Sequence, residues 1–215
     1  MELIHWFIDV VLHLDRHLVE LLAQYGIWIY AILFLIVFAE TGFVVTPILP
    51  GDSLLFAVGA LAAIDSSGNL QATAAWLLLA FAAILGNTVN YSIGRAIGPP
   101  AFSGRIRLLK VEYLKRTEAF FVRHGGMAIV LSRFVPIIRT FTPFVAGVGR
   151  MPYAKFQAYN IAGGLAWVTA FIWGGYLFGN IPLVKNNFGV VTLVIVVVSV
   201  LPIVWTAISG NRRPA

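Results

Sequence analysis

Four charged residues lie in two stretches of the chain that are otherwise apolar. Glu40 and Asp52 belong to the first stretch, and Arg133 and Arg139 belong to the second. Placing a charge in the hydrocarbon of a membrane is costly, so such residues usually pair with one another or face a functional cavity. Arginine stays charged and presents a planar fork of donors that matches phosphate oxygens. We therefore expect the four residues to meet near the middle of the membrane and to bind a charged lipid headgroup.

The first stretch, residues 27–64, contains the sequence ETGFVVTPILPGD. At about 1.5 Å per residue it is too long for one membrane span and too short for two full spans joined by a turn. Pro47 and Pro50 interrupt any helix near its middle. Irregular backbone at that depth must be buried in protein or line a wet cavity. This pattern predicts one span followed by a re-entrant hairpin near residues 41–62.

The second stretch, residues 127–148, contains SRFVPIIRTFTPFVAG and is broken by Pro136 and Pro143. Its TPFVAG sequence resembles TPILPG in the first stretch, and the two share a TPxxxG frame. Corresponding interrupted segments of opposite orientation are typical of inverted-repeat transporters, whose binding site lies where the repeats meet. The resemblance covers only six residues, but it favours a second re-entrant hairpin, near residues 127–149.

The basic residues indicate on which side the second hairpin opens. Residues 95–125 form a strongly basic amphipathic segment, which is expected on the cytoplasmic surface of the membrane. If the second stretch enters and returns on one side, Arg150, Lys155 and the tail 211–215 also face the cytoplasm. A full crossing would place them outside. The positive-inside rule therefore favours the hairpin and a cytoplasmic C-terminus.

The composition of the whole chain indicates an all-α polytopic membrane protein. Of its 215 residues, 60% are hydrophobic and only 11% are charged, whereas soluble domains carry about 25% charged residues. Full spans are predicted at 72–93, 156–178 and 189–208. With the span in the first stretch, these make about four membrane-spanning helices in a single membrane domain over residues 25–210.

Residues 1–24 have a different pattern, with polar side chains every three or four positions. This spacing predicts an amphipathic helix that lies at the membrane interface. His13 and His17 have a spacing that a metal could use, but neither HExxH nor an acidic cluster accompanies them. We therefore expect no metal site and no cofactor.

Each charged residue has a structural alternative to its functional role. Arg133 and Arg139, with Thr140 and Thr142 beside them, are the candidates for substrate binding, but the arginines could serve only to pair with the acids. A carboxylate placed between apolar surroundings and an arginine can take up and release a proton, so the two acids are candidates for proton coupling. Asp52 could instead cap a helix that starts at Ser53.

A second group of candidates lies in GNTVNYSIGR, within the predicted span 72–93 and its end. Asn87 and Asn90 or Tyr91 share one helix face, where polar side chains either hold helices together or line a site. For Asn90 and Tyr91 the first role is favoured. Arg95 is expected at the inner boundary of the membrane, as an anchor that faces anionic lipid.

Three segments of the sequence resemble the DedA family of bacterial inner-membrane proteins, whose shared module is called the VTT or SNARE-associated domain. They are ETGFVVTPILPGDSLLF, GNTVNYSIGR and HGGMAIVLSRFVPIIRTFTPFVAG. The resemblance implies two facing re-entrant hairpins and the movement of lipids between leaflets. The lipid is undecaprenyl phosphate for some members and phosphatidylethanolamine for others, and several members depend on the proton motive force.

The resemblance also assigns roles to residues of this chain. The essential acids of the family match Glu40 and Asp52, and its essential arginines match Arg133 and Arg139. Relatives often have an acid at the position of Asn87, so any proton step that uses that acid is in doubt here.

Three functions compete. A flippase or scramblase for an anionic lipid phosphate, undecaprenyl phosphate or a phospholipid, accounts for both the arginines and the acids. A proton-coupled carrier of a small soluble or cationic substrate would use the acids but has little need of two arginines. An enzyme is disfavoured because neither a Ser/His/Asp set nor HExxH is present in the sequence. The expected partners are membrane lipids and protons, not nucleic acid; a homo-oligomer is left open.

Overall fold

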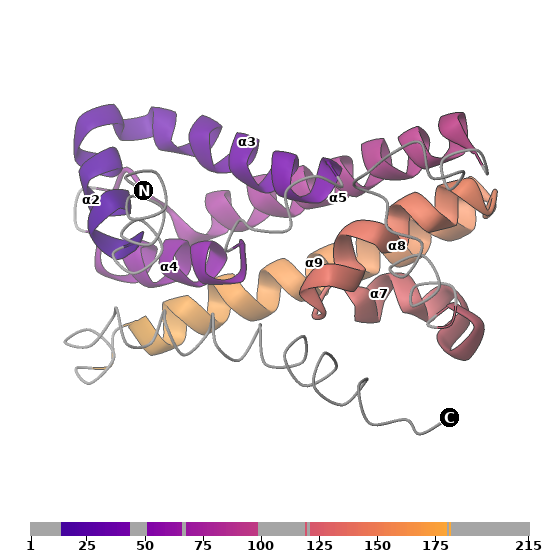
Figure 1. Cartoon of the computed structure of the whole chain (residues 1–215). Helices are drawn as coiled ribbons and strands as arrows, with labels where there is room; N and C mark the ends of the chain where they lie inside the picture. The colour runs from indigo at the N-terminus through magenta and orange to yellow at the C-terminus, as the bar shows by residue number, and fades with distance from the viewer. Residues whose placement is uncertain are drawn as a thin grey trace, which may run out of the picture. The chain divides into compact units, whose positions relative to one another are not determined.

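The computed structural model of the chain describes residues 14–43, 51–65, 68–98, 119, 121–179 and 181. All regular secondary structure in these residues is helical (Figure 1), which confirms the all-α prediction for this part of the chain. Several predicted features lie outside the described residues: the helix before residue 14, the segment TPILPG up to Pro50, most of the basic segment 95–125, the span 189–208 and the tail 211–215.

The chain divides into two compact units. Unit 1 comprises Met1–Phe34, Pro50–Leu79 and Val168–Ala215, and unit 2 comprises Leu35–Leu49 and Ala80–Trp167. Three helices contribute residues to both units: α3 (Ile29–Gly42), α5 (Ala72–Ile97) and α9 (Tyr153–Gly179). Each unit is described below by itself.

The first helices of unit 1 form an apolar run with one bend. Helix α2 (Leu14–Tyr25) is amphipathic, as the sequence predicts, and leads through the 3-10 turn η1 (Gly26–Trp28) into α3 (Ile29–Gly42). Gly26 has a φ of 51°, a backbone conformation that glycine adopts without strain. The chain changes direction there, and α2 packs against α4.

The candidate span in this region runs over His17–Gly42. The backbone bends at the predicted boundary, since α2 ends at Tyr25 and α3 begins at Ile29 after the turn η1. That the helix before this bend lies at the membrane interface stays a prediction.

Helix α4 (Gly51–Ile64) has 14 residues, which is fewer than the roughly 20 that cross a bilayer. It begins at Gly51, so the predicted start at Ser53 is wrong and Asp52 lies inside the first turn, where a carboxylate favours the helix dipole. The backbones of α4 and α9 touch in unit 1. A Cβ on Gly59 would lie 2.0 Å from the carbonyl oxygen of Ile172.

Two further helices are long enough to cross a membrane. Helix α5 (Ala72–Ile97) contains the predicted span 72–93, and α9 (Tyr153–Gly179) contains the predicted span 156–178. Together with His17–Gly42 they are the three candidate spans of the described residues, by length and composition.

The second broken stretch lies in unit 2 and forms two short helices that contact each other. The turn η3 (Gly125–Met127) leads into α7 (Ala128–Ser132), and α8 runs over Pro136–Val148. The break has a local cause, because Val135 precedes a proline and is extended, with φ −122° and ψ 102°. Neither helix is long enough to span a bilayer. That they form a re-entrant hairpin stays a prediction, as does the hairpin at 41–62.

Glycines in unit 2 bring α8 close to α5. A Cβ on Gly94 would lie 2.2 Å from the carbonyl oxygen of Phe144, and a Cβ on Gly147 would lie 2.1 Å from that of Tyr91. Contact at this distance requires residues without side chains, as in many membrane helix pairs. Tyr91 stacks on Phe156 of α9 in the adjoining apolar core, with 4.2 Å between ring centroids.

Candidate functional site

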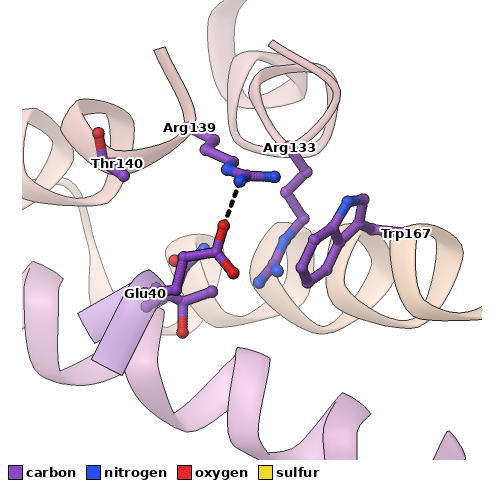
Figure 2. Close-up of a pocket in the computed structure, with 7 residues that line it drawn as sticks. Glu40, Arg133, Arg139, Thr140 and Trp167 are labelled. Carbon is purple, nitrogen blue, oxygen red and sulfur yellow. Dashed lines mark hydrogen bonds and ion pairs between the residues drawn. The ribbon is translucent and has the colours of Figure 1, made fainter. Parts of the chain in front are cut away.

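Unit 2 encloses a small cavity lined almost entirely by polar and charged side chains (Figure 2). Its volume is about 10 Å³, which is room for about one water molecule. The lining comes from the end of α3, from α5, from the break between α7 and α8, and from α8 and α9: Glu40, Thr41, Asn87, Arg133, Arg139, Thr140 and Trp167.

Arg139 and Glu40 form an ion pair across this cavity. Nη2 of Arg139 donates to Oε1 of Glu40, and Figure 2 shows the two side chains pointing at each other from α8 and α3. Glu40 is 0% exposed and Arg139 is 9% exposed. Close contact between the charges offsets the cost of removing both from solvent.

The position of Glu40 follows from close packing between α3 and α5. A Cβ on Gly86 would lie 2.0 Å from Oγ1 of Thr41 and 2.9 Å from the carbonyl oxygen of Phe38. Gly86 therefore lets α5 approach the last turn of α3. The next residue, Asn87, is buried and lines the same cavity as Glu40.

Arg133 has a different environment from Arg139. Its Nη2 donates to Oδ1 of Asn160 at 2.7 Å, and it lies 3.4 Å from the carbonyl oxygens of Ala83 and Asn160. Its Nε is buried and has no hydrogen-bond partner. Within the described part of the chain, no carboxylate pairs with Arg133, although only 3% of the residue is exposed.

One face of α9 holds Arg133 in place. A Cβ on Gly163 would lie 3.3 Å from both Cδ and Nε of Arg133, and one on Gly164 would lie 3.3 Å from Nη2. The indole of Trp167 also belongs to α9, and its ring centroid lies 6.0 Å from Cζ of Arg133 and 5.5 Å from Cζ of Arg139. Both distances are in the range of cation–π attraction. We call Asn160, Gly163, Gly164 and Trp167 the site face of α9.

Asn90 joins two of the elements that carry site residues. Its Nδ2 donates to the carbonyl oxygens of Thr41 on α3 at 3.3 Å and Thr140 on α8 at 2.9 Å. It therefore links helices, the role that was favoured for it from the sequence. Tyr91 also links segments, because its hydroxyl donates to the carbonyl oxygen of Met151. Arg95 is exposed and donates to the Tyr91 hydroxyl at 3.1 Å.

The cavity brings together half of the residues proposed from the sequence, Glu40 among them. Of the substrate-binding candidates, Arg133, Arg139 and Thr140 line the cavity, and so does the secondary candidate Asn87. Thr142 does not line it, because its hydroxyl donates to the carbonyl oxygen of Ile138 in its own helix, at 2.7 Å.

Asp52, the second proposed acid, is 7% exposed and belongs to unit 1, whereas the cavity belongs to unit 2. Its participation in the site stays a prediction. Sequence reasoning missed Thr41, Asn160 and Trp167. The signal for the last two was the spacing N-x-x-G-G-x-x-W on a span without formal charge, which places them on one helix face.

The lining residues make the cavity suited to an anion. Among the described residues around it, two carry guanidinium groups and one carries a carboxylate. The positive charge that no carboxylate among these residues balances is that of Arg133. Its Nε is a buried donor without a hydrogen-bond partner. An acceptor with several oxygens, such as a phosphate, would satisfy that donor. The described residues contain no group of three His, Asp or Glu side chains that could hold a metal ion.

Comparisons with known proteins agree with this picture of a membrane protein. The family model described as VTT domain matches residues 49–177. Protein DedA of Escherichia coli (strain K12) is 51% identical over 216 aligned residues, which cover 100% of this chain and 98% of that protein. An uncharacterized membrane protein of Mycobacterium tuberculosis (strain ATCC 25618 / H37Rv) is 42% identical over 174 residues, 80% of this chain and 76% of that protein.

Inner membrane protein YqjA of Escherichia coli (strain K12) is 34% identical over 195 residues, which cover 86% of this chain and 87% of that protein. No solved structure gives a significant match.

Proposed function

Because the chain belongs to the DedA family of VTT-domain membrane proteins, we propose that it is a flippase or scramblase for an anionic lipid phosphate. The substrate is undecaprenyl phosphate or a phospholipid, which the protein moves between the leaflets of the bacterial inner membrane. The observation that carries this proposal is Arg133, a buried guanidinium with no carboxylate partner in the described residues. A buried cation without a counter-charge is costly unless an anion joins it.

In this mechanism the phosphate of the headgroup binds by displacing a carboxylate that already occupies the site. The cavity holds about one water molecule, so a phosphate fits only after the lining has moved. Glu40 is the group to displace, because its carboxylate occupies Arg139. A proton that binds to Glu40 neutralises the carboxylate and weakens the ion pair, and the phosphate then takes its place on Arg139. Loss of the proton restores the pair and expels the headgroup.

This exchange gives the proton a defined role without enzymatic chemistry. No covalent bond of the lipid is made or broken, and the lipid tail stays in the bilayer while the headgroup passes the site. In this proposal the hairpins at 41–62 and 127–149 bring the site to mid-membrane, Asp52 is a second proton carrier, and the C-terminus is cytoplasmic.

The alternative, a carrier of a small cationic substrate, is supported less well. Two guanidinium groups and one carboxylate line the cavity in the described structure, and that charge repels a cation. A cationic substrate would also leave Nε of Arg133 without an acceptor. The charge of the lining therefore favours the lipid phosphate.

A leaflet-exposure assay on purified protein tests the proposal. Proteoliposomes carry a trace of one headgroup-labelled lipid: a polyprenyl phosphate, phosphatidate, or a neutral diacylglycerol of equal chain length. An impermeant quencher added outside measures the fraction of label in the outer leaflet. We expect transfer of the phosphates, little transfer of the neutral lipid, and loss of transfer in Arg133→Ala and Arg139→Ala.

Arg123→Ala is the matched control, because Arg123 is an exposed arginine outside the cavity. Its transfer rate should equal that of the wild type. Normal lipid transfer by purified Arg133→Ala or Arg139→Ala would refute the mechanism, and absence of transfer for every phosphate tested would refute the function.

A further inference from the structure

Arg133 and Arg139 line one cavity, but they are held by acceptors of different charge. Arg139 donates to a carboxylate, Glu40, whereas Arg133 donates its shortest hydrogen bond, of 2.7 Å, to the amide oxygen of Asn160. An amide oxygen fixes the position of a guanidinium but leaves its charge uncompensated. Asn160 is fully buried, so the choice of a neutral acceptor there decides the net charge of the site.

The orientation of the Asn160 amide is fixed by its other contacts. Its Nδ2 lies 3.0 Å from the carbonyl oxygen of Ile84, 3.3 Å from Oγ1 of Thr88 and 3.1 Å from Oε1 of Gln157. Two of these three are oxygens that can only accept. The amide nitrogen therefore has to face them, and the oxygen has to face Arg133.

The same contacts tie Asn160 to the surface of the protein. Gln157 donates to Thr88 at 2.8 Å and to the exposed hydroxyl of Tyr153 at 2.7 Å. Thr88 in turn donates to the carbonyl oxygen of Ile84 at 2.7 Å. Every donor in this hydrogen-bond network is neutral. The network therefore holds Asn160 rigidly without adding charge near Arg133.

The network also keeps Arg133 away from the cavity's carboxylate. Glu40 lines the same cavity and would attract a second guanidinium. The hydrogen bond to Asn160, the contact with Gly163 and Gly164 and the ring of Trp167 hold Arg133 on the site face of α9. The two arginines are thus kept in separate states, one neutralised and one not.

We propose that Asn160 is a positioning residue that keeps Arg133 charged and uncompensated, so that Arg133 is the first contact of the phosphate headgroup. Binding then has two steps. The phosphate pairs with Arg133 while Glu40 still holds Arg139, and it reaches Arg139 when Glu40 is displaced. This inference rests on the proposed function and adds to it which arginine receives the anion and why.

The test changes the net charge near the cavity by single substitutions and measures how tightly a phosphate lipid binds. Binding of a short-chain phosphatidate to the full-length protein in detergent is measured by titration calorimetry, with a short-chain diacylglycerol as the neutral probe. Asn160→Asp lowers the net charge of the cavity and the residues in contact with Arg133 by one, and Glu40→Gln raises it by one. We expect Glu40→Gln to bind more tightly than wild type, Asn160→Asp to bind about tenfold more weakly, and the double variant to return to within about threefold of wild type.

Because Glu40→Gln tightens binding by itself, recovery in the double variant is expected if net charge sets the affinity, and a matched control is needed to separate charge from damage. Gln157→Glu is the matched control, because it adds a carboxylate to the same network without a contact to Arg133. An equal loss of binding in Gln157→Glu, or no recovery in the double variant, would overturn the inference.

Asn160→Ala repeats the test without a new charge, should Asn160→Asp fail to fold. The released guanidinium is drawn to Glu40, so binding weakens in the wild-type background and does not weaken in the Glu40→Gln background. Equal losses in both backgrounds would refute the positioning role. If the wild type binds no phosphatidate, the proposed function fails as well; if it binds and Asn160→Asp binds equally, only this inference fails.

Discussion

Arg139 and Glu40 are 99 residues apart in the sequence and form a buried ion pair. One residue lies near the C-terminal end of α3 and the other lies in the first turns of α8. The pair therefore joins two segments that the chain would otherwise leave separate, and its two charges are balanced only when both are present.

Removing one partner of this pair should be worse than removing both. Arg139→Ala leaves the Glu40 carboxylate buried without its guanidinium, which we expect to lower the free energy of unfolding by about 3 kcal/mol. The double variant Arg139→Ala/Glu40→Ala should recover most of this loss, because neither charge is left buried without its partner. Denaturant titration in mixed micelles measures both values. A double variant less stable than Arg139→Ala would show that the pair does not couple the two sites.

Glu40→Gln should separate binding from translocation. The amide imitates the protonated acid, so the variant binds phosphatidate tightly but lacks the negative charge that expels the headgroup. We expect slower leaflet transfer and a flatter dependence on pH than in wild type, because the variant lacks the carboxylate that takes up the proton in the proposed exchange. The check is the transfer rate in proteoliposomes between about pH 5 and pH 8, where wild-type proton coupling is expected. A variant that keeps the wild-type rate and pH profile would exclude Glu40 as the proton site.

An added methyl group on the site face of α9 should displace Arg133. Gly163→Ala places a Cβ 3.0 Å from Cα of Val130 and 3.3 Å from the Arg133 side chain, so the guanidinium has to shift. We expect phosphatidate binding to fall about tenfold, since a displaced donor loses geometry as well as contact.

Gly174→Ala is the control on the same helix, because a Cβ there meets nothing within 4 Å. Alanine favours helix over glycine by roughly 1 kcal/mol, so this variant should be as stable as wild type or more so and should bind normally. Equal binding by Gly163→Ala and Gly174→Ala would show that the site face does not position Arg133.

Gly94→Ala should act on stability through the contact between α5 and α8. Its Cβ would lie 2.2 Å from the backbone carbonyl of Phe144, and backbone cannot rotate away as a side chain can. Separating the two helices should cost about 2 kcal/mol, within the range for overpacked sites. Thermal unfolding in detergent, compared with Gly174→Ala, measures the loss. An unchanged midpoint would mean that the two helices are not held at this distance.

Three of the four charged residues that the sequence singled out line the cavity, and so do Thr140 and Asn87, whereas Thr41 and Trp167 were missed. A charge in an apolar stretch is visible without any knowledge of the fold, so Glu40, Arg133 and Arg139 could be found from their type alone. That Arg139 pairs with Glu40 while Arg133 pairs with none of the described carboxylates could not be read from spacing, because it depends on which helices pack together.

Asn160 and Trp167 show why the rest was missed. Both lie in a span that carries no formal charge, where an asparagine or a tryptophan is as easily explained by helix packing or by the membrane boundary. The spans 72–93 and 156–178 were predicted closely, since length and hydropathy determine them locally.

The tightness of the cavity has a consequence for the cell. As the described residues line it, the space holds about one water molecule while Glu40 occupies Arg139. No column of water threads a space of that size, so the cavity as described is closed to hydrated inorganic ions. Under the proposed function, many copies could therefore stay in an energised membrane without discharging its voltage.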